Sequence, residues 1–333
     1  VLTCALPISF TGNLKEAKKH FSKLGIGTFS ILGIGTVAQI LLVYVIGAVC
    51  PQVMAHSWGM WLITFAPLYL IAVPIGLLLL RKVPAKPLEK HDLKPSRYIV
   101  TAIICIFMMY AGNILGTIIT ALLQLLPGVS AGNPILGYAT DNALLPKVLF
   151  MVILAPVIEE YIFRKQLIDR MHIYGEKLAV ITSALMFGLF HGNLSQLFYA
   201  FTLGLVFGYV YLKTGKLRYS IGLHMLINLI GSVIGPLFLE KIAVLDTMET
   251  LDLAALEPIM PWLIGFGAYV VVLIGLAIAG LVLLCINKRR VSFAPSEMEL
   301  PKGSRFTTVY VNVGMILLAV GCTALIVASV IPL

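Results

Sequence analysis

The chain has 333 residues, of which 59% are hydrophobic and only 12% are charged. A soluble domain carries about 25% charged residues, so this composition excludes an ordinary soluble protein and indicates a polytopic membrane protein. The net charge of +9 does not indicate nucleic-acid binding, because the basic residues lie in short segments between apolar stretches. Such segments are typical of loops that face the anionic cytoplasmic side of a membrane.

Neither the cysteines nor the first residues change the inference of a polytopic membrane protein. The cysteines are scattered and include no C-x-x-C pair, which indicates neither a disulfide framework nor a cysteine-based zinc site. They are Cys4, Cys50, Cys105, Cys285 and Cys322. The chain opens on Val1 rather than Met, which is typical of a fragment end or a cloning remnant. Residues 1–10 are too short, and have the wrong flanking residues, for a secretory signal.

Nine stretches are candidates for crossing a bilayer, which takes about 20 apolar residues. They lie at 26–49, 58–80, 98–126, 144–163, 177–191, 194–212, 217–238, 260–286 and 308–331. The fifth is short and depends on a turn at Gly192-Asn193. We therefore expect an all-α fold, a transmembrane bundle of eight or nine helices.

Charge alternates between successive loops. Every Lys and Arg except Lys147 and Lys241 falls in the N-terminal tail or in alternate loops after it. Because positive residues are retained on the cytoplasmic side, we expect the N-terminus inside and, with nine helices, the C-terminus outside. Merging the fifth and sixth stretches would scramble this alternation, which favours the turn between them.

Ionisable residues interrupt three of the apolar stretches. They occur as Glu159-Glu160-Tyr-Ile-Phe-Arg164, Phe187-Gly-Leu-Phe-His191 and His224-Met-Leu-Ile-Asn228. Charged groups in hydrocarbon cost several kcal/mol and usually mark a functional site. Together these side chains could activate a water molecule and stabilise an oxyanion, which favours an intramembrane hydrolase.

The two adjacent carboxylates are expected to differ in role. Neighbouring residues on a helix point about 100° apart, and Glu160 is spaced i,i+4 from Arg164, so these two side chains can pair. We expect the pair to orient the helix and to anchor it at the cytoplasmic interface. Glu159 is then left as the candidate base, since desolvation suits a carboxylate to general acid–base work. The alternative is a pair of solvated carboxylates at a helix end.

His224 and Asn228 share one face of a helix at i,i+4 spacing. Both can donate hydrogen bonds, and two donors that converge on one point could form an oxyanion hole. The alternative is that they hold helices together by interhelical hydrogen bonds. His191 ends the fifth stretch, where a histidine facing water is the alternative, and Phe187 on the same face is expected to pack rather than react.

In this order the three motifs resemble the CAAX protease and bacteriocin-processing family (CPBP, also called Abi), which includes the type II CAAX prenyl endopeptidases. The resemblance covers about 143–238. It implies an intramembrane endopeptidase of eight or nine helices, whose cavity opens toward the cytoplasm and the bilayer. By this resemblance Glu159 and His191 would activate the water, and His224 and Asn228 would hold the oxyanion. Glu160 and Arg164 would support the site.

The apolar stretches, the loop charges and the position of the motifs together predict an organisation for the chain. We expect a cytoplasmic tail at 1–25, three helices at 26–142, a catalytic core of about four helices at 143–238, and an acidic outer loop with two further helices at 239–333. The protein would be an integral multi-pass membrane protein, in the plasma membrane, with its active site toward the cytoplasm. Its partners would be the lipid bilayer and a peptide or lipidated protein substrate.

Zinc is the one cofactor in question. Glu159, His191 and His224 could supply the three protein ligands of a His₂Glu site. The helical His-Glu-x-x-His arrangement of many zinc proteases is absent from the sequence. Asn228 beside His224 suits an oxyanion role better than metal ligation, which favours metal-free activation of water.

Two functions without peptide hydrolysis are alternatives. A proton-coupled transporter could use Glu159, His191 and His224 as a relay, but the chain lacks the duplicated halves typical of such proteins. A bacteriocin immunity protein could bind its target without cleaving it. Both alternatives remain open from the sequence.

The expected depths of the site residues do not agree. If Arg164 and Arg218 mark helix ends, Glu159 and His224 lie roughly 7 and 9 Å inside, at about 1.5 Å per residue. Counted from Lys177, His191 lies roughly 20 Å inside. A shared site therefore requires that the fifth helix begins below the membrane surface, with 166–178 protruding, or that it tilts strongly.

Overall fold

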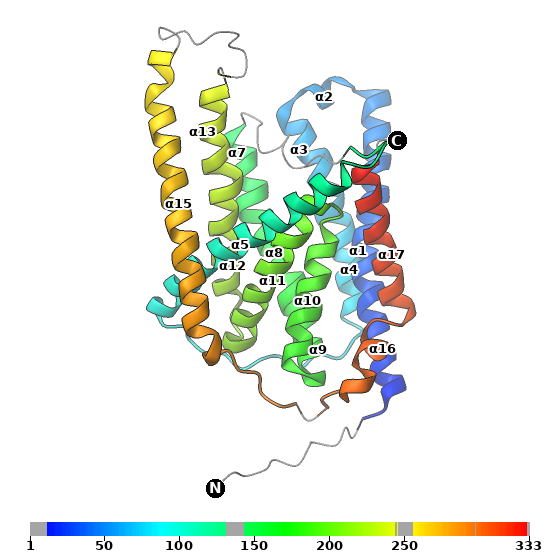
Figure 1. Ribbon diagram of the computed structural model, residues 1–333. Helices are drawn as coiled ribbons and strands as arrows, with labels where there is room; N and C mark the ends of the chain where they lie inside the picture. Colours follow the sequence, from blue (N-terminus) through cyan, green and yellow to red (C-terminus); the bar gives the residue numbers. More distant parts are fainter. Residues whose placement is uncertain (1–11, 131–142, 244, 246–255, 297, 332–333) are drawn as a thin grey trace.

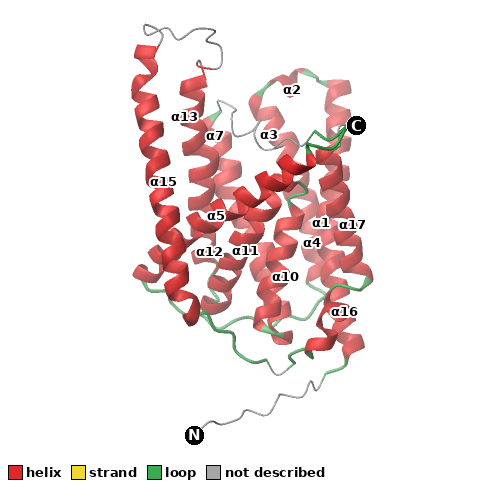
Figure 2. Cartoon of the chain, viewed as in Figure 1, coloured by secondary structure: helices red, strands yellow, loops and turns green. Residues whose placement is uncertain are grey.

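A computed structural model describes residues 12–130, 143–243, 245, 256–296 and 298–331. Within these residues the chain forms helices and loops, without strands (Figure 2). Seven of the described helices are long and apolar enough to cross a membrane. The predicted fold class, a polytopic helical bundle, is confirmed.

The N-terminal helix begins earlier than the hydropathy indicates. Helix α1 spans Leu14–Val49, and the Asn13 side chain accepts a hydrogen bond from the Lys15 amide at its first turn. Residues 14–25, which we expected within the tail, are therefore helical. Phe21 and Leu24 are fully buried there, so this first part of α1 packs on the protein.

Two long helical segments follow, and the basic loop at 81–94 connects them. Helix α2 (Gln52–Ala55) leads into α3 (Ser57–Ala66), which continues through a π-helical segment (Pro67–Ala72) into α4 (Val73–Leu80). Helix α5 (Pro95–Leu123) follows and runs obliquely across the bundle (Figure 1).

One long irregular helix carries both candidate carboxylates. Its successive parts are α7 (Leu144–Lys147), a π-helical segment (Val148–Leu154), α8 (Ala155–Glu160), a second π-helical segment (Tyr161–Ile168), α9 (Asp169–Met171) and a 3₁₀ turn (His172–Tyr174). It extends well beyond the predicted end at residue 163, and we call it the carboxylate helix.

The predicted spans at 144–163 and 177–191 are not among the seven helices that are long and apolar enough to cross a membrane. The first of them lies in the carboxylate helix, whose apolar sequence is interrupted by charged side chains. The other is α10 (Glu176–Phe190), which has only 15 residues. Both predicted stretches are helical, but the number of membrane crossings stays a prediction.

The predicted turn between the fifth and sixth stretches is confirmed. Gly192 has a φ of +65°, which favours glycine, and Asn193 caps helix α11 (Leu194–Thr214) by accepting from the Gln196 amide. Helix α10 packs closely against α11, since a Cβ on Gly204 would lie 3.0 Å from the Ala184 Cα. The site residues on these helices are thereby held near one another.

The remaining helices complete the bundle. Helix α12 (Leu217–Leu229) continues through a π-helical segment (Ile230–Ile234) into α13 (Gly235–Ile242). A 3₁₀ turn (Glu257–Ile259) precedes α15 (Met260–Asn287), and further 3₁₀ turns at Lys288–Arg290 and Lys302–Ser304 lead to α16 (Arg305–Val309) and α17 (Val313–Val330).

The last predicted span starts too early. Residues 310–312 interrupt the helix, and Asn312 caps α17 by accepting from the Met315 amide. Most of the predicted loop at 127–142 and much of the acidic loop at 239–259 lie outside the described residues.

The basic segments gather at one end of the bundle. There the 81–94 loop contacts two helix ends, through Lys86 N to Asp169 O (2.8 Å) and His91 N to Thr214 O (2.8 Å). Helix α1 begins at this end and α17 finishes at the opposite one (Figure 1). This arrangement agrees with the charge alternation, while the N-inside orientation stays a prediction.

Candidate active site

Glu160 and Arg164 form the predicted ion pair, with Arg164 Nε 3.1 Å from Glu160 Oε2. Its location differs from the prediction, because both side chains are 0% exposed. The helix continues past Arg164 to Tyr174, so Arg164 marks no helix end and the pair does not anchor an interface. The pair lies in the protein interior, and the supporting role predicted for it stays a prediction.

Aromatic rings surround the buried guanidinium. The Arg164 Cζ lies 4.6 Å from the centroid of the Phe187 ring and 5.7 Å from that of Phe207. Cation–π contacts offset part of the cost of burying the charge. Phe187 therefore packs, as its position before His191 predicted.

His224 lies between the two carboxylates. Its Nδ1 is 3.1 Å from Glu160 Oε1, and its Nε2 is 3.6 Å from Glu159 Oε2. The first distance is that of a hydrogen bond, whereas the second is longer than a hydrogen bond and joins the two groups only as an ion-pair contact. The Phe207 ring stacks on the imidazole at 5.2 Å. Glu160 therefore contacts His224 as well as Arg164, which the sequence did not predict.

The hydrogen bonding of His191 defines its tautomer. Its Nδ1 lies 2.8 Å from the Phe187 carbonyl oxygen, and a carbonyl can only accept, so Nδ1 carries the proton. In the neutral ring Nε2 then holds a lone pair. The Phe187 ring packs edge-on against the imidazole at 4.9 Å, which restricts the orientation of His191.

Asn228 links two helices. Its Nδ2 donates to the Met151 carbonyl oxygen at 2.8 Å, so α12 is tied to the carboxylate helix as the interhelical alternative expected. The amide has a second N–H, and this one remains for a ligand. The two roles are compatible in one residue.

The four predicted catalytic residues line one cavity of about 100 Å³. Glu159, His191, His224 and Asn228 thus come together from three segments that lie far apart in the sequence. The side chain of Glu159 is 25% exposed, whereas Glu160 lies behind the cavity wall.

Gln196 and Tyr199 also line this cavity and were missed by the sequence reasoning. Gln196 Nε2 donates to the Tyr199 hydroxyl oxygen at 2.9 Å. The hydroxyl can therefore still donate its own proton to another group. Their i,i+3 spacing, directly after the Gly192-Asn193 turn, is the signal that could have found them.

The mismatch in depth between Glu159 and His191 disappears because the carboxylate helix is longer than predicted. Glu159 lies 15 residues, or about 22 Å, from the helix end at Tyr174. His191 lies about the same distance from the start of α10 at Glu176. The two residues therefore reach the same level without a strong tilt of α10.

The zinc alternative does not fit the described side chains. Among the described residues, no three His, Cys, Asp or Glu side chains are grouped so that they could hold a metal ion. We derive no step through a metal.

The segment that contains these residues is similar to a known protein family. The family model described as "Type II CAAX prenyl endopeptidase Rce1-like" matches residues 141–230. The predicted family resemblance is confirmed. The matched segment contains all the predicted site residues, and it indicates a CAAX-type intramembrane endopeptidase. Neither the search of curated proteins nor the search of solved structures found a match.

Proposed function

We propose that this protein is an intramembrane endopeptidase that hydrolyses a peptide bond of a lipidated or membrane-proximal substrate with water activated by Glu159. One observation carries the proposal. Glu159, His191, His224 and Asn228 line a single cavity in the segment that matches the CAAX endopeptidase family.

In the first step Glu159 accepts a proton from water, and the water oxygen attacks the carbonyl carbon of the substrate. Nε2 of His191 accepts a hydrogen bond from the same water and orients it, since Nδ1 is committed to the Phe187 carbonyl. Base and orienting group approach the water from different helices, which defines the direction of attack.

The carbonyl oxygen gains negative charge in this step. Nε2–H of His224 and the second N–H of Asn228 donate to it. Positioned donors of this kind stabilise the transition state more than the substrate.

The oxyanion role proposed for His224 requires a proton on both of its ring nitrogens. Nδ1 faces the Glu160 carboxylate, which can only accept, and Nε2 must donate to the developing oxyanion.

In the second step the tetrahedral intermediate collapses and the C–N bond breaks. The protonated Glu159 returns its proton to the departing nitrogen, which leaves as an amine. The other product is a carboxylic acid, which ionises, and Glu159 is again a carboxylate.

The surroundings of the site suit a substrate that arrives from the bilayer. Ile153 and Val157, on the helix of Glu159, and Leu229, next to Asn228, are exposed apolar side chains. We expect a lipid-anchored peptide to reach the cavity along this apolar surface. Prenylated C-terminal peptides, the substrates that the family name implies, fit this approach.

Cleavage by protein purified in detergent tests the proposal. A farnesylated C-terminal peptide and the same peptide without its lipid are offered to wild type and to Glu159→Gln, and products are identified by mass spectrometry. We expect wild type to cleave the lipidated peptide and Glu159→Gln to be inactive while still folded. Equal cleavage by both proteins would remove Glu159 from the mechanism. Absence of cleavage by wild type across a lipidated peptide library would favour the immunity or transport alternatives.

A further inference from the structure

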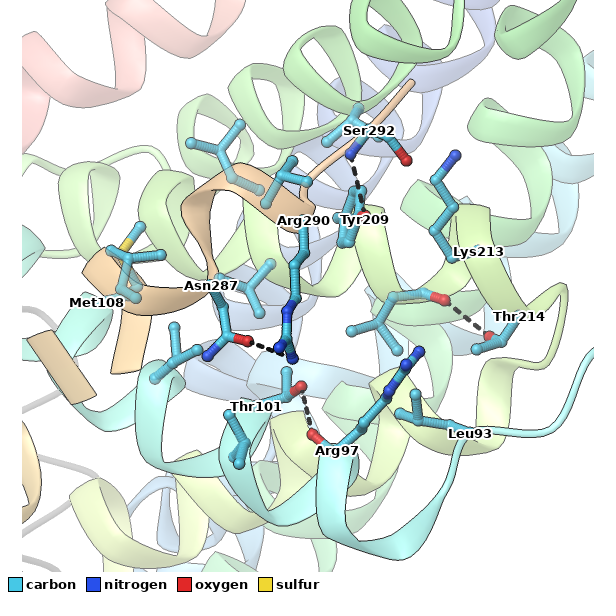
Figure 3. A pocket seen from close by; sticks show the side chains of 18 of the residues that line it. Leu93, Arg97, Thr101, Met108, Tyr209, Lys213, Thr214, Asn287, Arg290 and Ser292 are labelled. Atoms are coloured by element: carbon cyan, nitrogen blue, oxygen red, sulfur yellow. Dashed lines mark hydrogen bonds between the residues drawn. The ribbon is translucent and has the colours of Figure 1, made fainter. Parts of the chain in front are cut away.

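A second, larger cavity of about 1110 Å³ lies among α5, α10, α11 and α15 (Figure 3). It is separate from the candidate active site, since the two cavities lie on different faces of α11. Tyr199 and Phe207 face the active site, whereas Leu205, Val206 and Tyr209 line the larger cavity.

Most of the lining of this cavity is apolar. Side chains from all four helices contribute, among them Val100, Ile104, Val180, Ile181, Val206 and Leu284. A surface of this kind binds hydrocarbon rather than a small polar solute.

All charged residues that line the cavity are cationic. They are Arg97, Lys177, Lys213 and Arg290. Each lies at or next to a helix end, in the first turns of α5 and α10, the last turn of α11, and the 3₁₀ turn after α15. The cations therefore mark the end of the bundle where the basic loops gather.

Two of these cations have no carboxylate partner among the described residues, although Arg290 Nη1 donates a hydrogen bond to Asn287 Oδ1 at 3.3 Å. The Arg97 and Arg290 side chains extend into the cavity from α5 and from the end of α15 (Figure 3). Lys213 pairs with Glu176 at 2.7 Å, but within the described residues neither Arg97 nor Arg290 lies within 4.0 Å of an acidic group. An anionic group inside the cavity would accept charge-assisted hydrogen bonds from these two guanidinium groups.

We propose that this cavity binds an anionic phospholipid, with its phosphate between Arg97 and Arg290 and its acyl chains along the apolar wall. Basic pockets between transmembrane helices on the cytoplasmic side are typical sites for anionic head groups. A free phosphate ion would leave the apolar wall unused, and the choline group of a zwitterionic phospholipid would place a further positive charge beside its phosphate.

The bound lipid would stabilise one side of the catalytic core. Ser292 donates to the Tyr209 hydroxyl at 3.4 Å, and the Ala294 amide donates to Glu176 Oε2 at 2.7 Å. The segment after α15 is thereby held against α10 and α11, the helices that carry His191 and Tyr199. A lipid among these helices adds contacts that exist only in the folded protein, so binding raises the melting temperature.

Thermal unfolding of delipidated full-length protein in detergent tests the site. Phosphatidylglycerol, phosphatidylcholine with the same acyl chains, and inorganic phosphate are added separately. We expect phosphatidylglycerol to raise Tm at least twice as much as phosphatidylcholine, and phosphate to leave it unchanged. Equal shifts from the two lipids would overturn the proposal, and an equal shift from phosphate would assign the site to a free anion.

Matched charge variants locate the effect. Arg97→Gln/Arg290→Gln is expected to weaken phosphatidylglycerol binding by roughly 10- to 30-fold. Lys288→Gln/Arg289→Gln removes the same charge from the turn that contains Arg290, but neither residue lines the cavity, so it should bind as wild type does. Equal losses of phosphatidylglycerol affinity in the two double variants would show that binding depends on surface charge in general, and this would overturn the proposed site.

Val206→Trp provides an independent variant that keeps every charge. It fills the apolar part of the cavity, and the phosphatidylglycerol shift should fall by at least half. An unchanged shift would show that no acyl chain lies there and would overturn the proposal, even if the double arginine variant fails to fold. These measurements record lipid binding rather than cleavage, so they do not depend on the proposed peptidase function.

Discussion

Nδ1 of His224 lies 3.1 Å from Oε1 of Glu160, while the other oxygen of the same carboxylate faces Arg164 Nε at 3.1 Å. Glu160 therefore connects the buried cation to the ring that we propose as an oxyanion donor. A carboxylate that accepts from one ring N–H of a histidine fixes the orientation of the ring, and so the direction of the second N–H. This link makes Glu160 a positioning residue for His224.

Glu160→Gln should reduce kcat by roughly 10- to 100-fold, the usual cost of losing a group that orients a functional histidine. KM should change little, because Glu160 does not line the cavity. Steady-state kinetics on a lipidated peptide measure both constants. Glu176→Gln, near the basic end of the bundle, is the control and should keep the wild-type rate. A wild-type kcat in Glu160→Gln would show that Glu160 only pairs with Arg164 and does not position His224.

Arg164→Met should destabilise the fold by about 3–5 kcal/mol, because it leaves Glu160 buried without its cation. The double variant Glu160→Gln/Arg164→Met should regain part of this loss, since no uncompensated charge remains. Denaturant unfolding in detergent compares these variants with Arg289→Met, an exposed control that should unfold as wild type does. Equal stability of the single and double variants would contradict the coupling.

Asn228→Ala should lower kcat by about 10²–10³-fold, as expected for one oxyanion donor. It should also cost about 1 kcal/mol of stability, because the Met151 carbonyl loses its partner. Turnover and unfolding measured on the same preparation separate the two effects. If stability falls while kcat stays at the wild-type level, Asn228 only holds α12 to the carboxylate helix.

Tyr199→Phe tests a residue that the motifs do not include. We expect kcat to fall at least tenfold, because the hydroxyl lines the active-site cavity and receives a hydrogen bond from Gln196. Tyr209→Phe removes a hydroxyl on the opposite side of α11 and should leave turnover unchanged. Equal kcat for Tyr199→Phe and wild type would assign Tyr199 to the cavity wall alone.

Chelator treatment tests the metal-free mechanism. Cleavage should persist after dialysis against a strong chelator, and elemental analysis should find less than one zinc per chain, since the described His and acidic side chains form no three-ligand group. Loss of activity that added Zn²⁺ restores, together with one zinc per chain, would contradict the mechanism.

The sequence by itself determined the class of protein and predicted the residues of its candidate site. Hydropathy and loop charge are local properties, so they indicated a polytopic helical bundle and most helix positions. The three motifs predicted Glu159, His191, His224 and Asn228, because ionisable groups in apolar helices require partners. The i,i+4 spacing of Glu160 and Arg164 was sufficient to predict their ion pair.

Only the tertiary structure decided how these groups meet. The π-helical turns on both sides of Glu160 change the phase of the helix, and the helix continues to Tyr174 although its sequence becomes charged. Arg164 is thus buried rather than interfacial, and His191 reaches the level of Glu159. Contacts such as Glu160 with His224 join residues more than 60 positions apart. They depend on how α10, α11 and α12 pack, which no local pattern encodes.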